Sequence, residues 1–153
     1  MSGIYIHIPY CKQACHYCNY HFSTSLKNKE NVISAMLKEI EIKSVGNDDL
    51  IQTIYFGGGT PSFFETKEIN KIINSIFSKF KISENPELTL EANPDDLSKA
   101  KLIELSKSQI NRLSIGVQSF NDDELKLMNR SHNSDDAKYC IDNALKYYDN
   151  ISI

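Results

Sequence analysis

The chain lacks an apolar run long enough to cross a bilayer, and it lacks an excess of charge of one sign. Its 17 basic residues face 20 acidic ones, which gives a formal net charge of −3. This mild acidity gives no reason to expect nucleic acid or an acidic membrane surface as a partner. No basic segment precedes Ile4, and His7 and Pro9 interrupt the apolar stretch, which disfavours a secretion signal. We therefore expect a cytoplasmic protein.

The 153 residues also lack internal repeats, linkers and low-complexity segments. Hydrophobic residues make up 41% of the chain and charged residues 24%, which is typical of a soluble globular protein. A chain of this length usually forms one domain with a core of its own. We therefore treat residues 1–153 as a single unit.

Short apolar runs alternate with amphipathic stretches along the whole chain. Strands are predicted at 4–8, 50–56, 88–92, 112–118 and 151–153. Helices are predicted from Val32 to the Gly46 turn, after caps at Thr66, Ser98 and Ser134, and as a short turn over 122–128. Strands that alternate with helices favour an α/β fold with a parallel sheet.

The number of repeats limits the architecture. A closed (β/α) barrel of eight units needs about 250 residues, and this chain supplies four βα units and the start of a fifth strand. We interpret 1–153 as the N-terminal part of a partial (β/α) barrel whose C-terminal domain is absent. A small, complete, doubly wound domain is the alternative.

Three of the four cysteines, Cys11, Cys15 and Cys18, follow the first predicted strand with the spacing CxxxCxxC. Clustered cysteines in a reducing compartment indicate metal or redox chemistry more often than disulfides. Three thiolates on one loop suit a 4Fe-4S cubane in which one iron has no protein ligand. That open iron is a reason to expect chemistry as well as structure.

Two other interpretations of the cysteines remain open. A structural zinc site could be completed by His7, His16 or His21, which would make the chain a zinc-stabilised binding module without catalysis. Alternatively, Cys15 with Cys18 could form a redox dithiol. Zinc sites of this kind usually use two CxxC pairs, and a redox CxxC usually opens a helix. The sequence has one such pair, in a long polar loop, so the cluster is our prediction.

Other unusual residues also fall at the predicted ends of strands, where the active residues of parallel α/β folds collect. Gly57, Gly58 and Gly59 follow the second strand and are predicted to let a small polar ligand approach the backbone. Glu91 ends the third strand and Gln118 the fourth. Taken singly, Glu91, Gln118 and the Arg130–His132 pair could be ordinary surface groups.

Several other residues are predicted to be structural. Cys140 lies in the apolar stripe of the last helix, and we expect it to be buried in the core. We expect the same of the aromatic side chains Phe63, Phe64, Phe77 and Phe80. For His7 we expect a core histidine whose hydrogen bonds are satisfied.

Together these motifs resemble the radical S-adenosylmethionine (radical SAM) superfamily. The CxxxCxxC motif, with the aromatic Tyr17 before its third cysteine, matches the signature of that superfamily. Five further segments are similar to one branch of it, which contains oxygen-independent coproporphyrinogen III dehydrogenase and the HemW-type haem chaperones. They are Tyr-Ile-His-Ile-Pro-Tyr-Cys at 5–11, Gly-Gly-Gly-Thr-Pro-Ser at 57–62, Glu-Ala-Asn-Pro at 91–94, Gly-Val-Gln-Ser-Phe at 116–120 and Asn-Arg-x-His at 129–132.

The resemblance implies a role for each matching residue. Cys11, Cys15 and Cys18 would hold the 4Fe-4S cluster, and S-adenosylmethionine would chelate the fourth iron. The positions expected to contact S-adenosylmethionine are Tyr5, Gly58, Glu91, Gln118 and Arg130, and those expected to line a neighbouring second site are Tyr17, Gly59 and Thr60. An electron from the reduced cluster would split the sulfonium to methionine and a 5′-deoxyadenosyl radical.

Two departures favour the haem-chaperone subgroup of this branch. The dehydrogenase has a further cysteine two places after the third, where this chain has Tyr20, and it has an extension before its first strand. Both points cast doubt on a dehydrogenase activity here. The resemblance implies haem and haem-recipient proteins, some of them membrane-associated, as partners, and flavodoxin or ferredoxin as electron donor. The main haem-binding segment and an acidic residue for the ribose would lie beyond Ile153.

Overall fold

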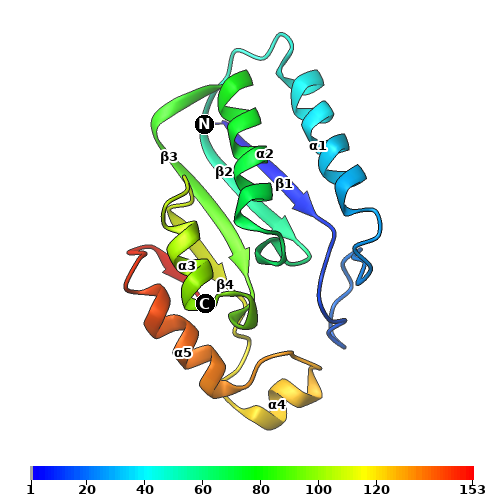
Figure 1. The fold of residues 1–153 in the computed structure, drawn as a ribbon, viewed down its shortest axis with the longest axis vertical. Coiled ribbons are helices and arrows are strands. Elements are labelled where there is room, and N and C mark those ends of the chain that lie inside the picture. The colour runs from blue at the N-terminus through cyan, green and yellow to red at the C-terminus, as the bar shows by residue number, and fades with distance from the viewer. Residues whose placement is uncertain (1) are drawn as a thin grey trace.

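In a computed structural model, which describes residues 2–153, five strands form one sheet (Figure 1). They are β1 (Ser2–Ile8), β2 (Leu50–Gly58), β3 (Lys81–Ala92), β4 (Arg112–Ile115) and β5 (Ile151–Ser152). Their spatial order is the order of the chain, and every neighbouring pair is parallel. The predicted partial (β/α) barrel is confirmed, because the sheet is wound in one direction and is not closed. The doubly wound alternative is wrong, since that fold requires the strand order to reverse.

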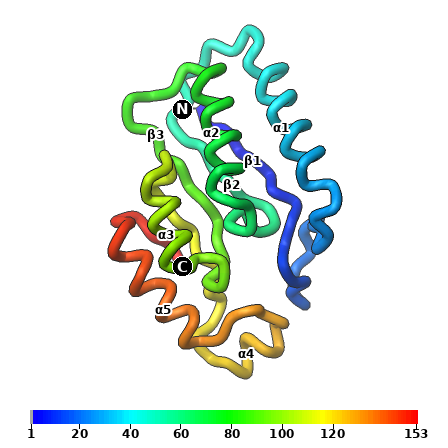
Figure 2. The backbone as a smooth tube through the Cα atoms, viewed as in Figure 1, coloured from blue at the N-terminus to red at the C-terminus, as the bar shows by residue number. Residues whose placement is uncertain are grey.

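Helices connect the strands. They are α1 (Lys29–Ser44), α2 (Thr66–Lys79), α3 (Lys99–Leu105), α4 (Asp122–Leu127) and α5 (Ser134–Ala144). In Figures 1 and 2, α2 and α3 lie in front of the sheet, α1 and α5 flank them, and α4 lies beyond the end of β4. In residues 2–153, none of these helices combines the length and the apolar character needed to cross a membrane.

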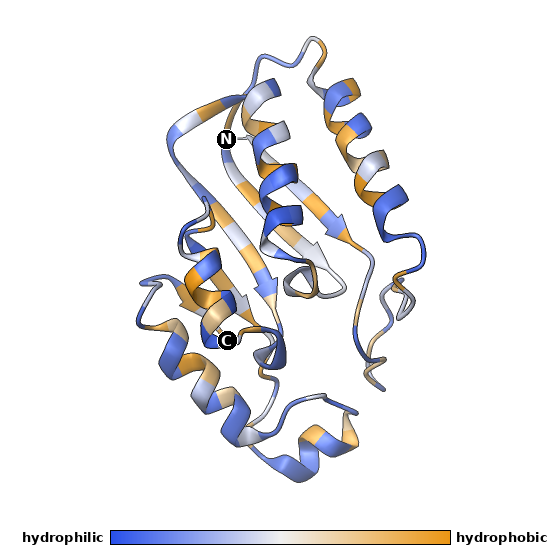
Figure 3. Cartoon of the chain, viewed as in Figure 1, coloured by the Kyte–Doolittle hydropathy of each residue, from blue (hydrophilic) through white to orange (hydrophobic). Residues whose placement is uncertain are grey.

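The two faces of the sheet differ in chemistry, which Figure 3 shows as alternating colours along the strands. The face toward the helices is apolar, and Ile54, Phe56 and Leu90 on it are fully buried. The other face places Tyr5 beside Tyr55 and Glu91 beside Ser114 in register. Because side chains alternate across a strand, the apolar residues of one face pack in the core, and the opposite face can carry polar side chains.

The core explains why α2 forms and where it lies. Its isoleucines at 69, 72, 73 and 76 recur at helical spacing, and all four are buried against the sheet. Phe64 and Cys140 are buried as predicted, whereas Phe63, Phe77 and Phe80 are partly buried at the margin of the core. His7 is exposed, so its predicted place in the core is wrong: it lies on the polar face of β1.

Several predicted boundaries are wrong: β3 begins at Lys81, seven residues before the predicted start, and other ends differ by fewer residues. The helix caps are Glu65 and Asn133, one residue before the predicted Thr66 and Ser134, while the predicted cap at Ser98 is confirmed. The Thr66 hydroxyl instead donates to Glu104 Oε2 at 3.1 Å. The fourth strand ends at Ile115 and not at the predicted Gln118, because the backbone turns sharply after Gly116.

Candidate functional site

The cysteine loop begins where Pro9 ends β1. Its three cysteines are free thiols, and the Cys18 N–H donates to the Cys15 carbonyl at 3.1 Å, which closes a turn between them. The Cys11 N–H donates to Ser23 O at 3.1 Å and ties the start of the loop to its end. Burial raises the pKa of the Cys11 thiol, and the Thr60 hydroxyl, which donates to its sulfur at 3.4 Å, partly offsets that rise.

The thiols of this loop line a cavity of about 610 Å³ at the C-terminal ends of the strands. The structure brings together there all the predicted site residues except Tyr5, namely Cys11, Cys15, Tyr17, Cys18, Gly58, Gly59, Thr60, Glu91, Gln118 and Arg130. Tyr5 lies outside the lining, on the same face of the sheet, where its ring stacks on Tyr55 with 6.1 Å between centroids. Its hydroxyl is 3.1 Å from His7 Nδ1.

The glycine run is needed mainly for close packing of the chain. Gly59 N–H donates to Ile8 O at 2.8 Å, and a Cβ on Gly59 would lie 2.6 Å from the Tyr10 carbonyl oxygen. Gly58 has φ +110°, a conformation that side chains rarely adopt, and its Cβ would meet the His7 ring. These glycines therefore let β2 run directly beneath the start of the cysteine loop.

We expect Gly59→Ala to lower the free energy of unfolding by about 2 kcal/mol, as overpacking against a rigid backbone does. Urea unfolding followed by circular dichroism measures the change. Gly46→Asn is the control, because Gly46 has φ +73° and nothing within 4 Å of its Cβ position, and asparagine tolerates that conformation. Equal midpoints for Gly59→Ala and the unchanged chain would contradict the close approach.

The Glu91 carboxylate is fixed by two donors. Tyr55 Oη donates to Glu91 Oε1 at 2.7 Å, and the Gly58 N–H donates to Oε2 at 3.2 Å. Burial, and then the bond to Glu91, raise the pKa of Tyr55, so its hydroxyl stays protonated and keeps donating. A half-buried carboxylate needs a hydrogen-bond partner, and for Glu91 that partner is Tyr55 on the neighbouring strand.

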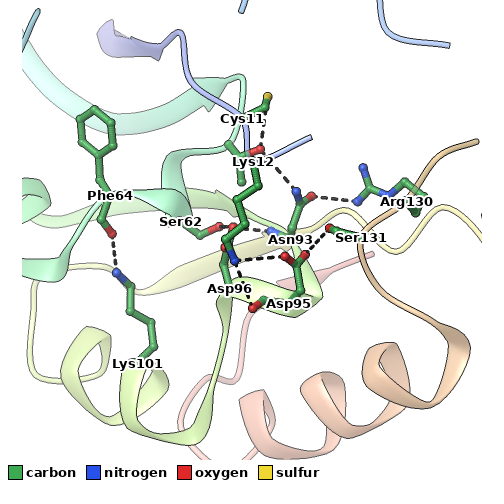
Figure 4. Close-up of polar contacts among 11 residues, drawn as sticks. Cys11, Lys12, Ser62, Phe64, Asn93, Asp95, Asp96, Lys101, Arg130 and Ser131 are labelled. Carbon is green, nitrogen blue, oxygen red and sulfur yellow. Dashed lines mark hydrogen bonds and ion pairs between the residues drawn. The ribbon is translucent and has the colours of Figure 1, made fainter. Parts of the chain in front are cut away.

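Arg130 joins three loops around the cavity. One terminal nitrogen donates to Cys15 Sγ at 3.2 Å and to Tyr17 Oη at 3.4 Å. The other donates to Asn93 Oδ1 at 2.8 Å (Figure 4). It also donates to the Gly116 carbonyl at 2.6 Å. Its Nε is buried and has no partner among the described residues, which leaves a donor for a ligand.

Gln118 is held in an unusual backbone conformation with φ +70°. The Ser119 N–H donates to the Val117 carbonyl at 2.9 Å, which closes a three-residue turn around Gln118. Buried His132 lies 3.1 Å from the same carbonyl through Nε2 and supports the turn. Residues in such conformations cluster at functional sites, where the surroundings hold them in place.

Sequence reasoning missed two residues of this site. Tyr55, which anchors Glu91, was counted only as part of an apolar run. Asn93 bridges Arg130 and Thr60, to whose Oγ1 its amide donates at 3.4 Å. Strand alternation was the available signal, but it assigns faces only within one strand. The register of β2 and β3 is also needed to show that Tyr55 and Glu91 lie on the same face.

The histidines of the zinc alternative have other partners or other positions. His7 bonds Tyr5, His16 Nδ1 donates to Leu127 O at 2.9 Å, and His21 lines a separate hollow. In the described part of the chain, no three His, Cys, Asp or Glu side chains are grouped as ligands of one metal ion. The three soft thiolates instead suit a 4Fe-4S cluster, in which each cysteine would bind a different iron and the fourth iron would have no protein ligand.

The profile of the radical SAM superfamily matches residues 5–153. The chain belongs to the radical SAM superfamily. Membership implies a 4Fe-4S cluster and S-adenosylmethionine as cofactors, and the donor set fits both: three free thiols, a fixed carboxylate and an unsatisfied guanidinium nitrogen share one cavity.

Curated radical SAM relatives are similar to almost all of this chain. It is 38% identical over 154 aligned residues to the haem chaperone HemW of Buchnera aphidicola from Acyrthosiphon pisum, covering 99% of the chain and 41% of the relative. It is 37% identical to HemW of Bacillus subtilis, covering 100% of the chain and again 41% of the relative. The chain thus spans about two fifths of the length of these relatives.

A solved radical SAM structure shares the fold. Coproporphyrinogen III oxidase (HemN) from Escherichia coli superposes with a TM-score of 0.87 over 95% of this chain and 34% of that one. The sequence identity is 24%, so this likeness describes the fold alone.

Proposed function

We propose that this chain carries the cofactor-binding part of a radical SAM core. Cys11, Cys15 and Cys18 would ligate three irons of the 4Fe-4S cluster, with the fourth iron open to the cavity. The observation that carries this proposal is that one cavity holds all three thiols together with Glu91 and Arg130. The zinc site and the redox dithiol, the two alternatives for these cysteines, give no role to Glu91 or Arg130.

The same cavity offers partners for S-adenosylmethionine. The fixed carboxylate of Glu91 suits the cationic part of the cofactor, and the free Nε of Arg130 suits an acceptor. Gly58 and Gln118 complete the proposed contacts in the cavity, Tyr5 would add one from the same sheet face outside the lining, and Tyr17, Gly59 and Thr60 would line a second site beside it. When bound, the two cofactors supply one-electron chemistry, while the chain supplies placement and exclusion of water.

For the whole protein we propose a haem chaperone that binds haem and delivers it to recipient proteins, including membrane-associated ones. The similarity to HemW proteins over nearly the full chain supports this proposal. A low-potential donor such as flavodoxin or ferredoxin would reduce the cluster. A reducing compartment such as the cytoplasm would keep the three thiols free to bind iron.

Coproporphyrinogen III dehydrogenase is the second candidate, favoured by the backbone likeness to HemN. The residue two places after the third cysteine argues against it. That residue is Tyr20, 71% exposed at the cavity, where the resemblance to the dehydrogenase requires another cysteine.

Iron and acid-labile sulfide analysis of anaerobically reconstituted protein tests the site. We expect about four irons per chain and a broad visible absorption that bleaches on reduction. One zinc per chain with no sulfide would refute the cluster. Haem titration of the full-length product, beside a porphyrinogen decarboxylation assay, separates the two functions: haem binding without decarboxylation supports the chaperone, and decarboxylation would overturn it.

A further inference from the structure

The cysteine loop is anchored from one side by Lys12, which lies between Cys11 and Cys15. Its ammonium pairs with Asp96 and, at 3.1 Å, with Asp95 Oδ2 (Figure 4). Both carboxylates belong to the single helical turn Pro94–Asp96 that follows β3. The Asp96 side chain is only 3% exposed, so its charge depends on Lys12 for compensation.

These two carboxylates are themselves fixed in place. Ser62 Oγ donates to Asp96 Oδ2 at 2.8 Å, and Ser131 Oγ donates to Asp95 Oδ1 at 2.8 Å. Ser62 follows β2 and Ser131 precedes α5, so the ion pair rests on segments from three parts of the barrel rim. A lysine held in this way is a rigid attachment for the backbone that carries it.

Asn129 anchors the loop from the other side. Its Oδ1 accepts from Gln13 Nε2 at 2.7 Å, and its Nδ2 donates to the Ala14 carbonyl at 2.8 Å. Gln13 Nε2 also donates to the Asn129 carbonyl at 2.9 Å. Asn129 has φ +57°, the left-handed conformation that asparagine and glycine tolerate best, which lets both its amide and its carbonyl face the loop.

Neither Lys12 nor Asn129 lines the cavity. Lys12 is nevertheless one of the three residues between the first two cluster cysteines, and Asn129 bonds the other two. A free loop would lose much conformational entropy when its three thiols converge on one cluster. A loop that side-chain hydrogen bonds already hold in shape loses little conformational entropy when the cluster binds. We propose that Lys12 and Asn129 are positioning residues that give the cysteine loop its cluster-binding shape before the cluster arrives.

This inference rests on the proposed cluster, and its test therefore includes a measurement on cluster-free protein. Asn129→Gly keeps the left-handed backbone and removes only the side-chain bonds, and Lys12→Met keeps the length of the stem and removes the charge. Lys12→Arg is the conservative variant. Lys138→Met is the matched control, since it breaks the exposed pair between Lys138 and Asp135 on α5.

In cluster-free protein, we expect faster amide hydrogen exchange at His16 and Cys18, whose N–H groups donate to the Met128 and Cys15 carbonyls, in Asn129→Gly and Lys12→Met than in the unchanged chain and Lys138→Met. On reconstitution, both variants are expected to bind iron about tenfold more weakly, as loss of supporting contacts around metal ligands does. The electron paramagnetic resonance spectrum of the reduced cluster should broaden, and Lys12→Arg should restore much of the iron binding.

Unchanged exchange and unchanged iron affinity in folded Asn129→Gly would overturn the proposal. Lys12→Met could fail to fold because Asp95 and Asp96 lose their counter-ion. In that case the triple variant Lys12→Met, Asp95→Asn, Asp96→Asn removes the two negative charges and still lacks the ion pair that anchors the loop. Failure of the unchanged chain to bind iron would instead refute the proposed cluster, and the exchange measurement would still decide whether the loop is held in advance.

Discussion

Cys15→Ser is expected to leave anaerobically reconstituted protein with less than about one iron per chain, against about four in the unchanged chain. Only two thiolates then remain on the loop, and a serine hydroxyl is a poor ligand for a soft metal site. Arg130 also loses the sulfur acceptor that it contacts at 3.2 Å. Iron and sulfide analysis together with the visible spectrum measures the effect.

Cys140→Ser is the matched control for this experiment. Cys140 is buried in α5, where burial raises its pKa to about 11, so about a thousandth of it is thiolate near pH 8. We expect this variant to keep its iron, and we expect native Cys140 to resist alkylation under conditions that modify the cluster-free loop. Full iron in Cys15→Ser, or loss of iron in folded Cys140→Ser, would contradict the assignment.

Glu91→Gln is expected to weaken S-adenosylmethionine binding by between about tenfold and a hundredfold. A hydrogen bond or contact to a charged group contributes about 1.5–3 kcal/mol, and the amide keeps the size of the side chain while removing its charge. The amide oxygen can still accept from Tyr55 Oη, whereas the amide NH2 then faces the Gly58 N–H, so circular dichroism must show that the variant folds. Isothermal titration of the cofactor into cluster-loaded protein gives the affinity.

Tyr55→Phe is the comparison that separates charge from position. It removes the hydroxyl that donates to Glu91 at 2.7 Å but keeps the ring that stacks on Tyr5. We expect a smaller loss of affinity, because the Gly58 N–H still holds the other carboxylate oxygen. Equal affinity in Glu91→Gln and the unchanged chain would refute the role of the carboxylate.

Sequence patterns were sufficient for the sheet and for the place of the site. Alternating isoleucines in β1 and the helical stripe of α2 follow directly from which face is buried, and both are in the structure as predicted. The convergence of the cysteine loop, Gly58 and Glu91 could also be predicted, since the ends of parallel strands meet at one edge.

The polar contacts between loops could not be predicted. The bonds of Asn129 to Gln13 and Ala14 join residues more than a hundred positions apart, and no local pattern encodes such pairs. The early end of β4 has the same origin, because Arg130 and His132 donate to the carbonyl groups of Gly116 and Val117 from outside the strand. His7 was misplaced because an alternating strand does not by itself reveal which of its faces is covered.

One planar group, the guanidinium of Arg130, touches the cysteine loop, the turn after β3 and the turn after β4. The guanidinium group is planar and rigid, so a displacement of any one of these segments displaces the hydrogen-bond donors of the other two. The three segments are therefore expected to become ordered or mobile as a unit. A ligand that orders one of them also orders the other two.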